Sequence, residues 1–293
     1  MKLGAHLPLI DFDGSPLEPS TLRAYVDAAR DSGFTAISAN DHLVFQRPWL
    51  DGIVALASIL ERSGGLTLAT TVALPVVRGP VPLAKAAAAL QILSGGRFVL
   101  GVAPGSSVAD YDAVGVPFEE RWPRFDDAVR VLRSALAELE PVPARPVPVW
   151  IGSWGSAAGL SRVARHGDGW LASAYNTTPG RLAAGVDILR EALRARGRDD
   201  TAFPIALATM WTYLTSSREE ARAKVEALGA MLNRDPAELA PQVLVGDADH
   251  CRAILQDYAD AGVGTTFLWP LGDPVTQLRR FGAEVAPRLV EGS

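Results

Sequence analysis

The stretch FTAISANDHL, residues 34–43, places an acid and an imidazole directly after an apolar run. Phe34 to Ala39 has the continuous apolar character of a strand that is buried on both faces. Asp41 and His42 follow at once, and an imidazole at the end of a strand can donate a hydrogen bond or act as a general acid or base. An ordinary loop explains the same residues if Asp41 caps the next helix and His42 is half exposed. The local sequence favours neither reading, so Asp41 and His42 are catalytic candidates.

A second candidate site is the glycine-rich turn in WIGSWGS, residues 150–156, which separates a predicted strand from a predicted helix. Backbone N–H groups at the start of a helix suit an anionic phosphate. The stretch lacks the lysine of a Walker loop, which disfavours a nucleotidase. A tight turn without any ligand is the competing explanation. The residues that would contact a phosphate are Gly152, Ser153, Trp154, Gly155 and Ser156.

Other chemistries fit the sequence poorly. The four histidines form neither an HxH nor an HExxH pair, so no metal site is expected. A Schiff-base enzyme needs a lysine in its site, but Lys2 precedes the first predicted strand, and Lys85 and Lys224 lie on predicted helices. No GxSxG nucleophile motif occurs, and the only cysteine, Cys251, lies on a predicted helix far from the strand ends.

The composition is that of an ordinary globular protein. The chain has 293 residues, of which 48% are hydrophobic and 21% are charged, with a net charge of -5. The negative charge argues against a nucleic-acid or membrane-surface binder. We expect a cytoplasmic protein, because the sequence has no apolar run of membrane-spanning length and no signal-peptide pattern at its start. A single cysteine also excludes an intrachain disulfide.

Strand and helix patterns alternate along the whole chain. The expected strands start near Leu3, Thr35, Leu66, Arg97, Val147, Gly169, Pro204 and Gly264. The expected helices cover residues 21–32, 50–63, 83–93, 124–139, 156–165, 179–196, 218–232 and 248–261. Eight strand–helix units in one chain of this length predict an α/β fold, a (β/α)8 TIM barrel over residues 1–293 as a single domain. Insertions in the connections are expected, with extra helices around residues 235–239.

The site of such a barrel lies where the strands end and the helices begin. The strand ends therefore gather the candidates, which are His6, Asp41, His42, Thr70, Thr71, residues 103–107, residues 152–155, residues 173–176 and Trp269.

Longer motifs resemble the bacterial luciferase-like monooxygenase family, whose members use flavin or the deazaflavin F420. The resemblance covers nearly the whole chain. The motifs are SGFTAISANDHL (32–43), TTVALPVVRGPVPLAKAAAALQILSGGRFVLGVAPG (70–105), DYDAVGVPFEER (110–121), VPVWIGSWGSAAGLSRVARHGDGW (147–170) and VLVGDADH (243–250). The most specific part is AK…LQILSGGRFVLGV followed by GVPFEER.

The resemblance implies roles for individual residues. His42 matches the family histidine that faces the cofactor, which would explain why the strand ends in Asp-His. Asp41 then orients His42 or caps the next helix. Thr71 and Val72 match the position of a non-prolyl cis peptide behind the cofactor ring. Residues 152–156 match the segment that meets the cofactor phosphate.

The chain also departs from the F420-dependent sugar-phosphate dehydrogenases of this family. Ser106 stands where those enzymes carry a glutamate acid, Asp110 lies one turn further on, and the lysines that would hold a sugar phosphate are missing. We therefore expect a different, small and mostly apolar organic substrate. Phe45 and Trp49 either line its side of the site or pack as ordinary helix aromatics.

The function expected from the resemblance is a luciferase-like oxidoreductase that binds coenzyme F420 or FMN. F420 implies hydride transfer, and reduced FMN implies monooxygenation; DHLVFQRPW and TTV favour F420. A metal-free isomerase or lyase that uses His42 and Asp110, and a non-catalytic flavin-binding protein, stay open as alternatives. A homodimer is expected through the apolar helix 50–63, if Ile53, Ala57 and Leu60 face the strands and the remaining apolar side chains are spread over other sides.

Overall fold

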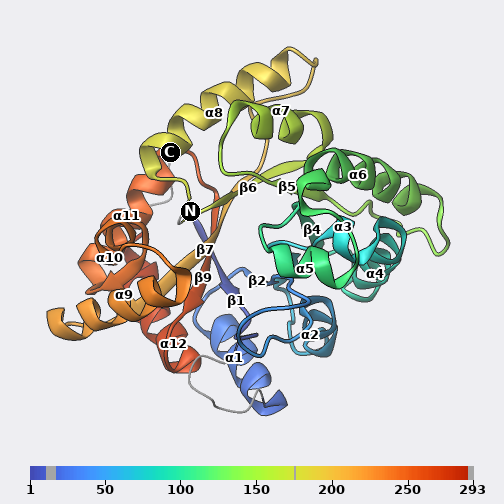
Figure 1. Ribbon diagram of the computed structural model, residues 1–293. Coiled ribbons are helices and arrows are strands. Elements are labelled where there is room, and N and C mark those ends of the chain that lie inside the picture. Colours follow the sequence, from blue (N-terminus) through green and yellow to red (C-terminus); the bar gives the residue numbers. More distant parts are fainter. Residues whose placement is uncertain (11–17, 175, 290–293) are drawn as a thin grey trace.

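The computed structural model describes residues 1–10, 18–174 and 176–289. Its strands form a closed parallel barrel with the helices packed outside it (Figure 1). Neighbouring strands follow the order β6-β5-β4-β3-β2-β1-β9-β7, and a β6–β7 pairing closes the ring. The predicted (β/α)8 TIM barrel is confirmed.

The barrel strands begin within two residues of the predicted starts. They are β1 (Lys2–His6), β2 (Ala36–Ala39), β3 (Thr67–Thr70), β4 (Phe98–Val102), β5 (Val149–Gly152), β6 (Gly169–Ser173), β7 (Ile205–Leu214) and β9 (Thr265–Pro270). Left-handed glycines end the helices before several of them, including Gly33 at φ 79° and Gly262 at φ 104°, as the glycine-ended helix pattern predicts.

The helices surround the barrel in chain order. They are α1 (Pro19–Asp31), α2 (Gly52–Ser58), α3 (Pro75–Arg78), α4 (Pro80–Leu93), α5 (Val108–Ala113), α6 (Arg121–Glu138), α7 (Ala157–His166), α8 (Pro179–Arg194), α9 (Arg218–Leu232), α10 (Pro236–Leu239), α11 (Ala248–Asp260) and α12 (Pro274–Glu284). Short 3-10 turns are η1 (Phe118–Glu120), η2 (Ala240–Gln242) and η3 (Ala286–Arg288). None of the helices in the described part of the chain has the length and apolarity that crossing a bilayer requires.

The predicted insertion between β7 and β9 contains more than helices. The expected extra helix is present as α10, but the sequence pattern missed β8 (Leu244–Gly246), which pairs in parallel with the end of β7 outside the ring. No element was predicted at residues 243–246, because a strand of three residues is too short to show a pattern.

The inside of the barrel is filled mostly by small side chains around the Phe267 ring. Phe267 packs with buried residues from four other strands, which are Ala36, Ala69, Leu171, Ala206 and Ala208. Gly4 on β1 leaves the space for this ring, because a Cβ there would lie 2.5 Å from Phe267 Cδ1. The filled interior leaves the carboxyl ends of the strands as the open end of the barrel.

The predicted face of the helix in residues 50–63 is wrong. The helix is the shorter α2, with Asp51 as its N-cap, and Leu56 and Ile59 are buried at 0% and 1% exposure, whereas Ala57 is exposed. Val54, at 66% exposure, is the large apolar side chain that α2 presents outward. The apolar run therefore packs mostly on the barrel, and it no longer supports a dimer interface.

Candidate functional site

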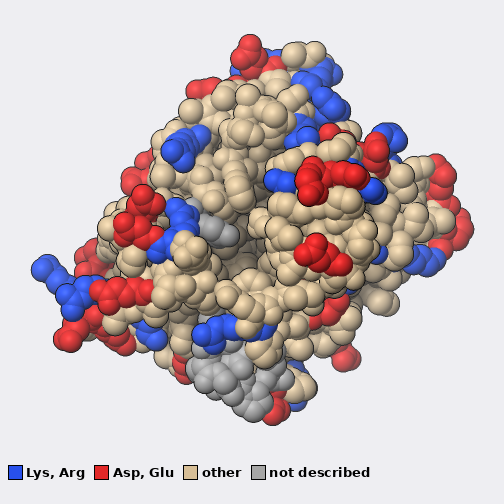
Figure 2. Space-filling view, viewed as in Figure 1, with Lys and Arg blue, Asp and Glu red and all other residues tan. Residues whose placement is uncertain are grey.

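A cavity of about 510 Å³ opens at the carboxyl ends of the barrel strands. This volume is in the range of small-molecule and cofactor pockets. Its walls come from the ends of β2 to β7 and β9, from the start of α6 and from the end of α9. The lining residues among the sequence candidates are Asp41, His42, Phe45, Trp49, Thr71, Val72, residues 103–106, Gly152, Ser153, Trp154, Ser156, Ser173 and Trp269, whereas Gly155 is not one of them. The face in Figure 2 is hollowed near its centre, where uncharged side chains predominate.

His42 is held by the Asp110 carboxylate of α5, the short helix after β4. Its Nδ1 lies 2.8 Å from Asp110 Oδ2, and Asp110 Oδ1 accepts hydrogen bonds of 2.8 Å from the N–H groups of Leu43 and Val44. The Asp110 side chain is 1% exposed and that of His42 is 19% exposed. Ser107 caps α5 by accepting from the Asp110 N–H, and this short helix carries Asp110 back toward the loop after β2.

The electrostatics of this pair fix the imidazole tautomer. Burial alone would raise the pKa of Asp110, but hydrogen bonds from His42, Val44 and Leu43, together with the His42 charge, hold the pKa below its ordinary value. An ionised carboxylate only accepts hydrogen bonds, so His42 must donate through Nδ1–H. Nε2 of His42 then remains for a group in the cavity, as a proton acceptor in the neutral ring and a donor in the charged ring.

Asp41 has a different partner from the one that the sequence suggested. Its carboxylate is paired with Arg78 of α3, with Arg78 Nη2 2.6 Å from Asp41 Oδ1, and it also accepts from the Leu74 N–H at 3.3 Å. The same Arg78 Nη2 lies 2.5 Å from Asp51 Oδ2. The expectation that Asp41 orients His42 or caps the next helix is therefore wrong, because Asp110 binds the imidazole and Asp51 caps α2.

The turn between β5 and α7 is fixed by its own side chains. Trp170 Nε1 donates to the Ser153 carbonyl at 3.0 Å, and Ser153 Oγ accepts from the Gly155 N–H at 3.2 Å. Ser156 caps α7 by accepting from the Gly159 N–H. The first N–H groups of a helix have no intrahelical acceptor, so this turn presents donors to the cavity that Ser153, Trp154 and Ser156 line.

The cis peptide expected between Thr71 and Val72 is present. Both residues line the cavity, where Thr71 is buried and its Oγ1 has no hydrogen-bond partner among the described residues. Ser106 lies on the neighbouring loop, after β4, and is exposed at the cavity edge. An unpaired buried oxygen of this kind fits a ligand that carries N–H or O–H groups.

Sequence reasoning missed several residues of the cavity wall. Asp110 was considered only for a cofactor-free reaction, and Arg121, the last residue of the GVPFEER motif, was not singled out although it lines the cavity. Trp211 of β7 lines the wall, as do Trp49 and Trp269. Searching the predicted strand ends for site residues finds Trp269 but not Trp211. The reason is that β7 extends to Leu214, which is further than its apolar pattern indicates.

The wall also contains a strained backbone position. Thr209 has φ 61°, at a register shift between Leu207 and Met210 where β7 pairs with β9. A β-branched residue rarely adopts positive φ, and such strain gathers at functional sites. The bulge turns residues 208–209 into the cavity, and nothing in the sequence signals it.

A parallel (β/α)8 barrel with a histidine, a glycine-rich turn at a helix start and an aromatic wall around one cavity belongs to the ligand-binding barrel enzymes as a class. The family model described as luciferase-like monooxygenase matches residues 8–265. The chain belongs to this family.

Individual relatives agree with the family match. The chain is 25% identical over 309 residues to the F420-dependent hydroxymycolic acid dehydrogenase of Mycobacterium tuberculosis, covering 92% of this chain and 84% of the relative. It is 24% identical over 318 residues to the F420-dependent glucose-6-phosphate dehydrogenase of Amycolatopsis mediterranei, covering 92% and 95%.

Solved structures agree with the fold. An F420-dependent secondary alcohol dehydrogenase in complex with an F420-acetone adduct superimposes with a TM-score of 0.86 at 16% identity, covering 99% of each chain. A monooxygenase from Streptomyces bottropensis superimposes with a TM-score of 0.84 at 20% identity, covering 99% of this chain and 100% of the other.

Proposed function

We propose that the protein is an oxidoreductase that binds F420 or FMN in the strand-end cavity and acts on a small, mostly apolar organic substrate. The observation that carries the proposal is that His42 and the start of α7 line one cavity of about 510 Å³. F420 is the preferred cofactor, because relatives that match 92% of the chain are named as F420-dependent.

The residues of the cavity fit such a cofactor. The α7 turn offers N–H groups to a phosphate, and Arg121 adds a fixed cation on the same cavity wall. The unpaired Thr71 Oγ1 offers a hydrogen-bond partner to the polar edge of a ring. Bound F420 supplies hydride chemistry, whereas reduced FMN supplies oxygen activation.

The protein residues then orient the substrate and exchange a proton with it. Asp110 holds His42 so that Nε2 faces the cavity, where it can give or take a proton at the reacting carbon–oxygen group of the substrate. The aromatic side chains of Phe45 and Trp49, which contact the His42 ring, exclude water beside that nitrogen. Asp41 pairs with Arg78 and in this way supports the loop that carries His42. It has no direct part in the reaction.

The substrate class follows from what the cavity lacks. Arg121 is the only lysine or arginine among the described residues that line it, and Ser106 stands where the sugar-phosphate enzymes carry an acid. This supports an apolar substrate over a sugar phosphate. Membership of the family also argues against the isomerase or lyase alternative, although the His42–Asp110 pair could abstract a proton unaided.

Titration with F420 and with FMN, followed by cofactor fluorescence, tests the proposal. Ala158→Asp provides the sharpest variant, because an acid in the first turn stabilises a helix but repels a phosphate there. Ala158 is exposed, so the fold is expected to stay intact. We expect affinity to fall about tenfold or more, with Ala158→Asn as the uncharged control. Unchanged affinity in the folded aspartate variant would move the phosphate away from α7.

We also propose that residues 1–293 act as one catalytic domain in the cytoplasm and associate as a homodimer. The family resemblance is the remaining support for the dimer, because α2, the helix expected at the interface, is mostly buried on the barrel. Light scattering at low micromolar concentration tests it, and a monomer mass would refute it.

A further inference from the structure

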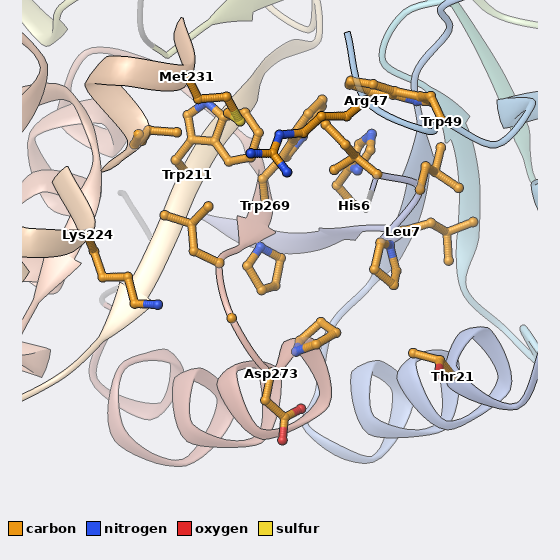
Figure 3. A pocket seen from close by; sticks show the side chains of 18 of the residues that line it. His6, Leu7, Thr21, Arg47, Trp49, Trp211, Lys224, Met231, Trp269 and Asp273 are labelled. Carbon is orange, nitrogen blue, oxygen red and sulfur yellow. The ribbon is translucent and has the colours of Figure 1, made fainter. Parts of the chain in front are cut away.

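A second cavity, of about 540 Å³, lies beside the first one. It is lined by the end of β1, α1, α9 and the connection from β9 to α12 (Figure 3). The two cavities share a wall, because Ile10, Trp49, Trp211, Met231 and Trp269 line both. The proposed function assigns no role to this second space.

Aromatic rings make most of the shared wall. The ring centroids of Trp211 and Trp269 are 4.8 Å apart and those of Trp49 and Trp269 are 6.4 Å apart, both in edge-on arrangements. Figure 3 shows these rings gathered with His6 and Arg47 along one side of the cavity, opposite α1 and α12. The three rings therefore form the boundary between the two cavities.

His6 is a buried polar group of this cavity, together with the indole N–H groups of Trp49 and Trp269. Its side chain stacks on Trp269, with ring centroids 3.7 Å apart and an interplanar angle of 28°. The residue is 3% exposed, and its Nε2 has no hydrogen-bond partner in the described part of the chain. The Asn40 side chain lies within hydrogen-bonding range of the imidazole and acts to raise its pKa, but neither His6 Nε2 nor Asn40 Oδ1 has a hydrogen bond of acceptable geometry among the described residues.

An unpaired nitrogen at this depth requires an explanation. A buried polar atom without a partner costs about 1–3 kcal/mol, so native proteins rarely keep one without a reason. Tyr25 donates to the His6 carbonyl at 2.6 Å, which fixes the backbone and leaves the ring facing the cavity that it lines. Nε2 itself is almost inaccessible, so a ligand atom in the cavity would pair with it after the neighbouring side chains shift.

The charges around the cavity do not select a charged ligand. Arg47 and Lys224 line it, but so do Glu18 and Asp273. Asp273 caps α12 and accepts hydrogen bonds from Thr276, and the Lys224 ammonium lies 4.7 Å from the centre of the Tyr213 ring. The remaining lining is mostly apolar, which favours an uncharged guest.

We propose that the second cavity binds the distal part of the substrate, an uncharged apolar group with one hydroxyl that pairs with His6 Nε2. A hydroxyl can donate and accept, so it suits either tautomer of the imidazole. The inference rests on the proposed function. It places one substrate across both cavities, with its reacting end at His42 and its distal end at His6. His6 is then a specificity-determining residue.

Calorimetric titration of the cofactor-free protein with 4-phenylcyclohexanol and with phenylcyclohexane tests the site directly. We expect the alcohol to bind about five- to tenfold more tightly, and His6→Leu to abolish that preference. Leucine leaves no unpaired nitrogen, so the variant is expected to fold. An equal preference in the wild type and in His6→Leu would overturn the proposal, as would no saturable binding of either compound.

Two tryptophan variants on α9 place the binding in the second cavity rather than the first. Ala227 lines only the second cavity and is exposed, so Ala227→Trp fills the space without burying a strained side chain. Arg222, with its side chain 74% exposed, lines neither cavity, so Arg222→Trp is the control. We expect Ala227→Trp to weaken the affinity for 4-phenylcyclohexanol at least tenfold and Arg222→Trp to leave that affinity unchanged. Retention in both variants would refute the location.

The outcomes separate this proposal from the assignment of the cofactor. Alcohol binding that depends on His6 in a protein that binds neither F420 nor FMN would refute the proposed function and leave the second cavity standing. Cofactor binding without any alcohol binding would refute the second cavity as a binding site and leave the proposed function standing.

Discussion

His6 should make the folded protein sensitive to mild acid. Burial lowers the pKa of His6 from 6.5 to about 3, with the Leu7 backbone and the Asn40 side chain acting in the opposite direction. The unfolded chain therefore takes up a proton on this residue near pH 6.5, whereas the folded protein does not until about pH 3. Stability is accordingly lost as the pH falls through this window.

The size of the loss follows from the two pKa values. Each pKa unit corresponds to about 1.4 kcal/mol. Between about pH 7.5 and about pH 5, the difference in proton binding between folded and unfolded His6 removes about 2 kcal/mol of unfolding free energy. That is a large part of the ~5–15 kcal/mol that stabilises a typical protein.

Urea unfolding of the wild type and of His6→Leu at both pH values measures this term. Leucine does not titrate, and the other ionisable groups contribute equally to both proteins. We expect the stability of the wild type relative to the variant to fall by about 2 kcal/mol on acidification. Trp269→Phe, which alters the same ring stack without removing an ionisable group, should show no such change. A pH-independent difference between wild type and His6→Leu would refute the burial of a neutral imidazole.

Three further changes test the loops around the first cavity. Asp110→Asn keeps an oxygen for the Leu43 N–H but presents an amide to His42, so turnover should fall about 100-fold or more with cofactor affinity unchanged; a loss below about threefold would contradict the positioning role. Arg78→Met leaves the Asp41 carboxylate buried without its cation and should cost about 3–5 kcal/mol in urea unfolding, whereas a loss under about 1 kcal/mol would contradict a buried pair. Thr209→Asn should raise stability by about 1 kcal/mol, because asparagine tolerates positive φ better, and a lower melting temperature would refute the strain.

The barrel was predictable because its signals are local. Each strand is a short apolar run, and glycine or small polar residues stand at the helix ends before it, so the pattern repeats without knowledge of the partners. The strand β8 escaped because three residues are too few for a period. The buried face of α2 escaped for a different reason. An apolar helix leaves several faces possible, and only packing against β2 and β3 selects Leu56 and Ile59.

The candidate site was predictable in its position but not in its partners. Strand ends place His42 and the β5–α7 turn at one end of the barrel, as the fold requires. The pairing of His42 with Asp110 depends on a contact across 68 residues of sequence, and Asp41 is the nearer acid. Adjacency in sequence favoured Asp41, but its carboxylate points to Arg78 instead. Such choices are made by tertiary packing, which no local pattern encodes.

The loop after β2 connects the two cavities mechanically. Asp110 holds its first part through His42, and Arg78 ties both of its ends by pairing with Asp41 and Asp51. Between these ties lies Trp49, whose ring lines both cavities. A movement of this loop therefore changes the first cavity at His42 and the second cavity at Trp49 together. Loosening Arg78 should accordingly alter binding at His6 as well as turnover at His42, although Arg78 lines neither cavity.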